Sequence, residues 1–205
     1  MNNATDRSVT DRIALIDLDG TIADYDGEMH RRMELIRGPN EPVFEGWDNV
    51  PPHISCRRDL IKKQPGFWRG LPRLRKGFEV VDELREFKFE LHVLTKGPVK
   101  TTSAWTEKVE WCQENIPDAN VTVTQDKSIV YGRILFDDFP PYFTAWLRNR
   151  PRGLVICLAH PWNAQYGVGG SEENANVFRY SGLDDVHELR ARLRKAFDRG
   201  SGQSP

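Results

Sequence analysis

The sequence of 205 residues has little cysteine, no excess of either charge and no long apolar run. Its three cysteines, Cys56, Cys112 and Cys157, form neither a CxxC motif nor a Cys/His cluster, which argues against structural zinc and favours free thiols in a reducing compartment. No stretch approaches the roughly 18 apolar residues of a membrane span. Residues 1–12 contain no apolar core, so we expect no secretory signal and predict a cytoplasmic protein.

Acidic and basic residues nearly cancel, with 30 Asp and Glu against 29 Lys and Arg. A protein that binds nucleic acid over a large surface is usually basic, so this balance argues against that class. One stretch departs from the average, because residues 57–76 hold eight basic residues and a single acidic one, Asp59. Three interpretations stay open for it: a rim that attracts an anionic substrate, a groove for a nucleic-acid end, or a solvated helix face.

Short apolar runs alternate with helical patterns along most of the chain. Strands are predicted at 13–16, 91–94, 121–124, 134–136, 154–158 and 177–180. Helices are predicted at 24–38, 76–87, 101–115, 141–149 and 183–197. In the helix at 101–115, Trp105, Val109 and Cys112 are expected to share the buried face. Strands that alternate with helices are typical of a parallel sheet with helices on both faces.

The stretch from 24 to 75 interrupts this alternation between the first two strands. Within it, residues 39–55 are rich in Pro, Asn and Gly and are predicted to be irregular. We therefore predict an α/β fold, a three-layer Rossmann-like parallel sheet with a small helical cap inserted after the first strand. The core domain would comprise 1–23 and 76–199, the cap 24–75, and residues 200–205 a disordered tail.

Polar residues stand directly after several predicted strands. Asp17 and Asp19 follow the first strand, Thr95 ends the second, and Asp137 and Asp138 follow the fourth. Ligands of open parallel sheets bind at the carboxyl ends of the strands, so we expect these side chains to converge on one site.

The residue types at these positions suit phosphate chemistry. Crowded carboxylates cost stability unless a cation neutralises them, and oxygen ligands favour Mg²⁺. One Asp can attack phosphorus, and a second can protonate the leaving oxygen and then activate water. Lys127, after the third strand, is a suitable counter-charge. Singly, each residue is explained by a turn, a helix cap or a surface lysine, but their common position at strand ends favours a phosphoryl-transfer site.

The motifs resemble those of a known superfamily. The segment IALIDLDGTIA at 13–23 is similar to the first motif of the haloacid-dehalogenase-like phosphatases, and LHVLT, the DK at 126–127 and ILFDD are similar to the other three. The narrower resemblance is to the 5′(3′)-deoxyribonucleotidase family. It rests on DLDGTIADY, QPGFWRGLP, LTKGPVKTTSAWTEKVEWCQENI, TQDKSIVYGRILFDD and HPWN, and it covers 12–28 and 64–163.

The resemblance implies catalytic and metal-binding roles for four aspartates. Asp17 would be the nucleophile and a Mg²⁺ ligand. Asp19 would be the general acid and base and would offer its main-chain carbonyl to the metal. Asp138 would be the third protein ligand, with Asp137 beside it orienting water or the metal's other ligands.

The resemblance also implies how the substrate is held. Thr95 and Lys127 would bind the phosphate, and Tyr25 would be an aromatic group near the substrate. In the cap, Phe44 and Trp47 are candidates to stack on a base. The sequence departs from the family pattern twice: Lys96, also assigned to substrate binding, replaces a frequent Ser, and Gln125 replaces a frequent Arg. A basic group would then have moved between loops.

These observations predict a Mg²⁺-dependent phosphomonoesterase whose substrate is a small phosphorylated compound, best matched by a nucleoside monophosphate. The same chemistry on nucleic-acid ends or on other phosphorylated metabolites is the alternative. A non-catalytic binding module is a third interpretation, which the complete set of Asp17, Asp19, Lys127 and Asp138 disfavours. The sequence leaves the oligomeric state and the base preference open.

Overall fold

The computed structural model describes residues 12–44, 49–164 and 176–200, so the predictions for residues 1–11 and 201–205 lie outside the described chain. The strands are β1 (Ile13–Ile16), β2 (Glu90–Lys96), β3 (Asn120–Thr124), β4 (Ile134–Phe136), β5 (Leu154–Leu158) and β6 (Val177–Tyr180). The helices are α2 (Tyr25–Leu35), α3 (Pro52–Lys62), α4 (Arg75–Glu86), α5 (Ser103–Asn115), α6 (Pro140–Asn149) and α7 (Val186–Gly200).

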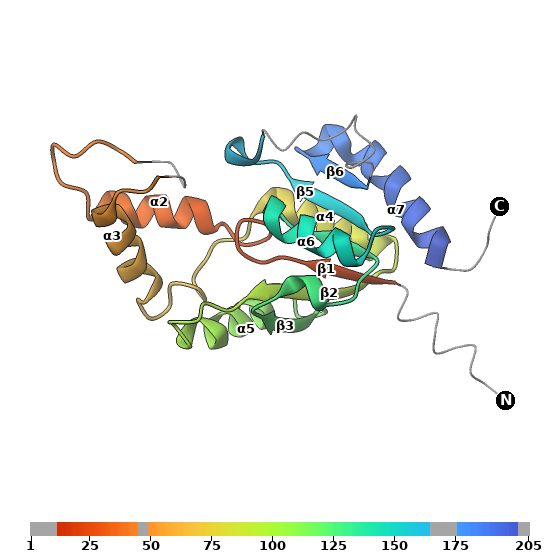
Figure 1. Cartoon of the computed structure of the whole chain (residues 1–205), viewed down its shortest axis with the longest axis horizontal. Coiled ribbons are helices and arrows are strands. Elements are labelled where there is room, and N and C mark those ends of the chain that lie inside the picture. Colours follow the sequence, from red (N-terminus) through yellow and green to blue (C-terminus); the bar gives the residue numbers. More distant parts are fainter. Residues whose placement is uncertain (1–11, 45–48, 165–175, 201–205) are drawn as a thin grey trace.

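All six strands run parallel in one sheet, in the order β3-β2-β1-β4-β5-β6 (Figure 1). The chain starts in the middle, builds outward through β2 and β3, and then crosses to the other side of β1. Such a reversal leaves a crevice at the carboxyl ends of the central strands, because the connections from β1 and β4 leave toward opposite sides. The predicted α/β, Rossmann-like class is confirmed.

Apolar side chains cover both faces of the sheet. On one face, Ile16 and Phe136 belong to a large cluster that includes residues of α4, α5 and α7. On the other, Leu15 and Leu135 pack with Trp146 of α6. Central strands buried on both faces need continuous apolar runs, which explains the unbroken sequences of β1 and β4.

The segment between β1 and α4 leaves and rejoins the core at one place. The main-chain N–H of Asp24 donates to the Pro72 carbonyl, and that of Leu74 donates to the Ile22 carbonyl, each at 2.8 Å. Beyond this pairing, α2 and α3 extend past the end of the sheet as two packed helices (Figure 1). No helix in the described ranges is both long and apolar enough to cross a membrane.

Three local predictions are wrong. Helix α3 begins at Pro52, within the stretch expected to be irregular, because proline is well tolerated in the first helical turn, where its missing N–H has no intrahelical partner. The buried face of α5 is formed by Ala104, Lys108, Trp111 and Cys112 instead of the face centred on Trp105 and Val109. Gly200 ends α7 and so does not belong to a disordered tail.

Candidate active site

The carboxyl ends of β1 and β4 bring three aspartates together. Asp17 follows β1, and Asp137 and Asp138 follow its neighbour β4. All three side chains are buried, and one carboxylate oxygen of each lies within 4.8 Å of the others. The sheet therefore places at its central crevice the carboxylates that the sequence predicted would converge there.

Lys127 lies among these carboxylates. Its Nζ is 2.6 Å from Asp17 Oδ1 and 2.8 Å from Asp137 Oδ2, and the side chain is almost fully buried. Burial by itself would lower the pKa of Lys127, but Asp137 and Asp17 outweigh this effect and raise the pKa above its ordinary value. Lys127 thus stays charged and is shared by two carboxylates.

One lysine does not balance three buried carboxylates. Burial raises the pKa of Asp137 to about 7, against the opposing effect of Lys127. Burial, followed by the charges of Asp17 and Asp137, raises the pKa of Asp138 well above its ordinary value. An all-oxygen cluster with surplus negative charge is the donor set that a hard divalent cation neutralises, so these residues fit Mg²⁺.

The two adjacent aspartates differ in what their oxygens contact. Asp137 uses both, since Oδ2 meets Lys127 and Oδ1 accepts the Phe139 main-chain N–H at 2.8 Å. Asp138 Oδ1 accepts a hydrogen bond from the Thr21 hydroxyl at 3.0 Å. Asp138 is consequently better placed to bind a ligand, whereas Asp137 holds Lys127 and the start of α6.

The loop that carries Asp19 touches the loop that carries Asp138. Gly20 has φ = +75°, and a Cβ at this position would lie 2.3 Å from Asp138 Oδ2. A side chain is therefore excluded both by the backbone conformation and by the approaching carboxylate. His160 Nε2 donates to the Gly20 carbonyl at 2.7 Å, and the buried Asn163 side chain donates to the Asp138 carbonyl at 2.9 Å. The HPWN segment thus ties the two loops together.

Asp19 is paired with a residue that the sequence analysis missed. Lys108 of α5 is buried and donates hydrogen bonds to Asp19 Oδ2, to Thr95 Oγ1 (3.2 Å) and to the Lys96 carbonyl (2.8 Å). Burial raises the pKa of Asp19, and Lys108 is the main opposing influence. The sequence did contain a signal for this role, because Lys108 lies three residues before Trp111 and so shares its helix face. It was missed because the buried face was expected to include Trp105 and Val109 instead.

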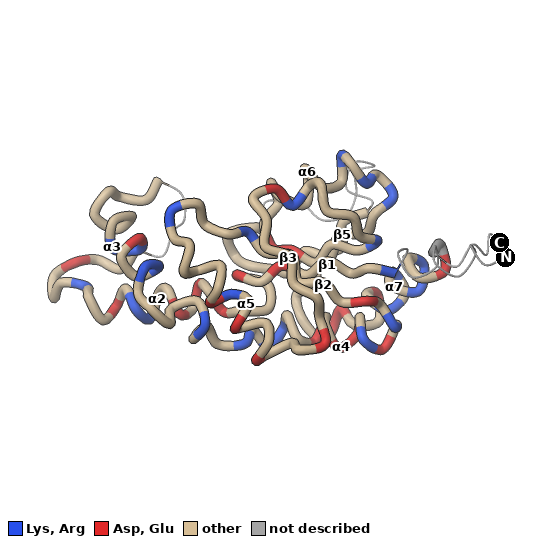
Figure 2. Tube along the Cα trace, turned by 90° about the horizontal axis from the view of Figure 1, so that it is seen from below, with Lys and Arg blue, Asp and Glu red and all other residues tan. Residues whose placement is uncertain are grey.

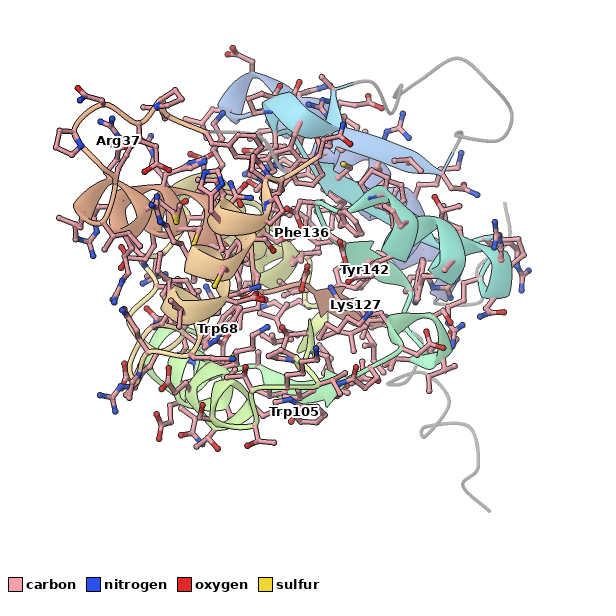
Figure 3. The ribbon with its side chains drawn as sticks, turned by 60° about the vertical axis from the view of Figure 1, so that its left-hand side comes forward. Arg37, Trp68, Trp105, Lys127, Phe136 and Tyr142 are labelled. Carbon is pink, nitrogen blue, oxygen red and sulfur yellow. The ribbon has the colours of Figure 1, made fainter. Side chains whose placement is uncertain are left out.

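A pocket of about 250 Å³ opens over these groups. It is lined by Asp17, Asp19, Gly20, Tyr25, Asp26, Lys96, Lys127, Asp138, Phe139, Tyr142 and Trp162. Figure 3 shows Lys127 and Tyr142 next to each other at this part of the core. Most of the predicted site residues therefore line one cavity. Thr95 is fully buried next to it and accepts a hydrogen bond from Lys108.

The aromatic candidates separate into two places. Tyr25 lines the pocket and stacks on Trp68, with ring centroids 5.5 Å apart and planes at 15°. Phe44 lines a different pocket of about 330 Å³, between α2 and α3, where the Arg58 guanidinium lies 5.5 Å from its ring centroid. Trp47 lies outside the described residues. Among the aromatic candidates that the structure describes, Tyr25 lies in the carboxylate pocket and Phe44 does not.

Four of the eight basic residues in the stretch 57–76 form ion pairs. Arg57 pairs with Glu41, Lys62 with Asp59, Arg69 with Glu110 and Arg75 with Glu79. Figure 2 shows basic and acidic segments side by side in the region of α2 and α3. The stretch therefore offers less uncompensated positive charge than its composition indicates.

Comparison with known proteins shows that the sequence matches a known protein family. The model of the family described as "5' nucleotidase, deoxy (Pyrimidine), cytosolic type C protein" matches residues 11–175. A Bordetella pertussis protein provisionally named a 5′(3′)-deoxyribonucleotidase is 26% identical over 161 residues, which are 74% of this chain and 85% of that protein. The human cytosolic 5′(3′)-deoxyribonucleotidase is 23% identical over 139 residues, 60% of this chain and 69% of its own.

Among solved structures, a hydrolase from Pseudomonas syringae aligns with a TM-score of 0.47 and 13% identity, covering 87% of this chain and 97% of the other. The family match spans all six site positions at the strand ends: Asp17, Asp19, Thr95, Lys127, Asp137 and Asp138. The chain therefore belongs to this 5′-nucleotidase family, and it is a phosphoric monoester hydrolase.

Proposed function

We propose that the protein is a Mg²⁺-dependent phosphatase that removes the phosphate of nucleoside, and in particular deoxynucleoside, monophosphates. The observation that carries the proposal is the buried set of Asp17, Asp137 and Asp138 around Lys127, at the floor of a pocket in a chain of this family. The names of the relatives, deoxyribonucleotidases, support the substrate class.

In the first step Asp17 attacks the phosphorus of the substrate. Its Oδ1 is committed to Lys127 and to the Leu18 N–H at 2.7 Å, so Oδ2 is the oxygen available to form the new bond. The bond between phosphorus and the leaving oxygen breaks, and Asp19 gives that oxygen a proton. Burial raises the pKa of Asp19, which favours the protonated form that this step requires.

In the second step a water molecule gives its proton to Asp19 and attacks the aspartyl phosphate. Phosphate is released, and both aspartates return to their initial states. Lys108 would hold the Asp19 side chain in place between the two steps, and Thr95 and Lys127 would bind phosphate oxygens. A Mg²⁺ ion held by Asp17, Asp138 and the Asp19 carbonyl would neutralise charge between the nucleophile and the phosphate.

Residues 24–75 would act as a cap over this pocket. The chain enters and leaves the segment through one paired passage at Ile22–Asp24 and Pro72–Leu74, which is a suitable hinge. Tyr25 and Trp68 would lie above the leaving group and exclude water from it. Phe44 would contact the substrate only after a movement that brings its pocket toward the carboxylates.

The test is phosphate release from a panel of nucleoside 5′- and 3′-monophosphates, sugar phosphates and a 3′-phosphorylated oligonucleotide, with Mg²⁺ and with EDTA. We expect Mg²⁺-dependent turnover of mononucleotides and a phosphorylated Asp17 peptide in acid-quenched samples. Turnover of only the oligonucleotide would retain the mechanism and replace the substrate. Activity that survives both EDTA and Asp17→Asn would refute the proposed mechanism.

A further inference from the structure

The three lysines around the pocket differ in how their charge is balanced. Lys127 contacts two carboxylates and Lys108 contacts Asp19. Lys96, at the end of β2, lines the same pocket but has no carboxylate within ion-pair distance among the residues that the structure describes. Lys96 is therefore the pocket lysine without a direct ion pair, although its positive charge also acts on the exposed carboxylate of Asp126.

An aromatic ring holds the Lys96 ammonium. Its Nζ lies 4.9 Å from the ring centroid of Tyr142 in the first turn of α6, and Lys127 Nζ lies 5.0 Å from the same ring. The ring of Phe139 packs against that of Tyr142 with its plane inclined by 65°, and the two ring centroids are 4.8 Å apart. The face of an aromatic ring attracts a cation through its quadrupole but carries no net charge, so it fixes the ammonium without neutralising it.

The main chain at Lys96 is fixed independently of Tyr142. Lys108 donates to the Lys96 carbonyl at 2.8 Å, and the Gln125 side chain donates to the carbonyl of the next residue, Gly97. Lys96 pairs in register with Thr124, the neighbour of Gln125. The backbone is thus set by β3 and α5, and what Tyr142 decides is where the flexible end of the lysine side chain points.

We propose that Tyr142 is a positioning residue that holds Lys96 in the pocket as a cation without a direct ion pair, ready to bind the substrate phosphate. The inference rests on the proposed function, since it assumes that the anion in this pocket is a phosphate. It assigns to α6 a part in substrate binding: the ring face acts through Lys96 and not through the tyrosine hydroxyl. Without the ring, the lysine side chain would spread over several rotamers, and phosphate would meet the cation less often.

The experiment measures binding of inorganic phosphate to the Mg²⁺-loaded protein by calorimetry, in Tyr142→Phe, Tyr142→Leu, Lys96→Met and the Tyr142→Leu/Lys96→Met double variant. We expect Tyr142→Phe to bind within about 2-fold of the wild type and Tyr142→Leu to bind about 5-fold more weakly, as the loss of one ring–cation contact predicts. Lys96→Met should be at least as weak as Tyr142→Leu, and the double variant should be no weaker than Lys96→Met.

The matched control is Tyr131→Leu. Tyr131 is an exposed tyrosine whose ring lies 5.5 Å from the Arg150 guanidinium, away from the pocket, and its loss should leave phosphate binding unchanged. Equal weakening in Tyr142→Phe and Tyr142→Leu would overturn the inference, because the hydroxyl would then be responsible. So would a further loss on adding Tyr142→Leu to Lys96→Met, because the ring would then act through Lys127 or through folding.

A second measurement separates this inference from the proposed function. Ring currents of Tyr142 should shift the Lys96 side-chain NMR signals in the absence of any ligand, in the wild type and in Tyr142→Phe but not in Tyr142→Leu. If that shift is present but phosphate does not bind the wild type, the proposed function is refuted. The role of Tyr142 in phosphate binding is then refuted too, although the contact between Lys96 and the Tyr142 ring is confirmed. If phosphate binds but the shift is absent, only the present inference is overturned.

Discussion

The sheet and the inserted segment are stabilised in different ways. Helix α4, which packs on the sheet, buries six of its twelve residues, whereas α2 buries two of eleven, one of them the charged Glu28. Glu28 is held by Arg31 and Arg32, and Glu41 by Arg57. The core thus depends on apolar packing, whereas the segment combines these ion pairs with apolar residues such as Met29, Ile61 and Phe67, which join the core cluster. Substitutions in the two regions should therefore have different consequences.

The largest effect on activity is expected in the core, at the proposed nucleophile. Asp17→Asn should lower kcat roughly 10⁴-fold, because an amide cannot form the aspartyl phosphate. Phosphate release measures it, with Asp82→Asn as control, an exposed aspartate of α4 paired with Arg85. If Asp17→Asn keeps more than a few per cent of the activity, the nucleophile lies elsewhere.

Apolar truncation should separate the two regions by stability. Leu135→Ala, fully buried in β4, should lower the free energy of unfolding by about 3 kcal/mol through the cavity it leaves. Ile54→Ala in α3 should cost less, about 2 kcal/mol, because Ile54, although buried, borders a pocket and leaves less of a closed cavity. Urea unfolding measures the free energy of unfolding of both variants. Equal decreases for Leu135→Ala and Ile54→Ala would show that the segment has a packed core of its own.

A smaller effect on stability is expected for a substitution at Glu107, where the inserted segment is attached to the core. Glu107 of α5 accepts the main-chain N–H groups of Gly66 (2.8 Å), Trp68 (3.0 Å) and Arg69 (3.4 Å). Glu107→Ala should cost about 1–2 kcal/mol, because these donors lose a charged acceptor but can reach water. It should also raise KM more than it lowers kcat, because Trp68 supports Tyr25. A fall in kcat at unchanged KM would contradict this account.

The smallest effect should come from an ion pair one turn away on the same helix. Glu110 lies 3.6 Å from Arg69, and both side chains are substantially exposed. Glu110→Ala should change the free energy of unfolding by less than about 0.5 kcal/mol, because water and salt screen exposed charges. Added salt should remove even that difference. If Glu110→Ala lowered the free energy of unfolding as much as Glu107→Ala, then ion pairing, and not hydrogen bonding to main-chain N–H groups, would attach the segment to α5.

The core strands could be predicted from sequence because the apolar run of each strand in a doubly covered sheet is set by local composition. The predicted runs at 13–16, 91–94 and 134–136 lie in β1, β2 and β4. The positions of Asp17, Thr95 and Asp138 at the ends of these strands follow from the three runs. The start of α3 was missed because the stretch 39–55, rich in Pro, Asn and Gly, was predicted to be irregular, whereas Pro52 occupies the first helical turn.

Lys108, Asn163 and Tyr142 could not be assigned from sequence, because their roles depend on contacts with distant parts of the chain. Lys108 meets Asp19 from 89 positions away, and Asn163 meets Asp138 from 25. A buried lysine in a helix resembles a surface lysine until the residue that it faces is known. The same holds for Phe44, whose place in the inserted segment separates it from the carboxylates.

By itself, the sequence determined the α/β class, the insertion after the first strand and the aspartates at the strand ends, because hydrophobic periodicity and turn residues act over a few positions. Only the tertiary structure decided which lysines are neutralised, which oxygens of Asp17, Asp137 and Asp138 are engaged, and that Lys96 rests on Tyr142. These depend on charge and ring contacts over a few ångströms between elements far apart in the chain, which the strand order of the sheet brings together.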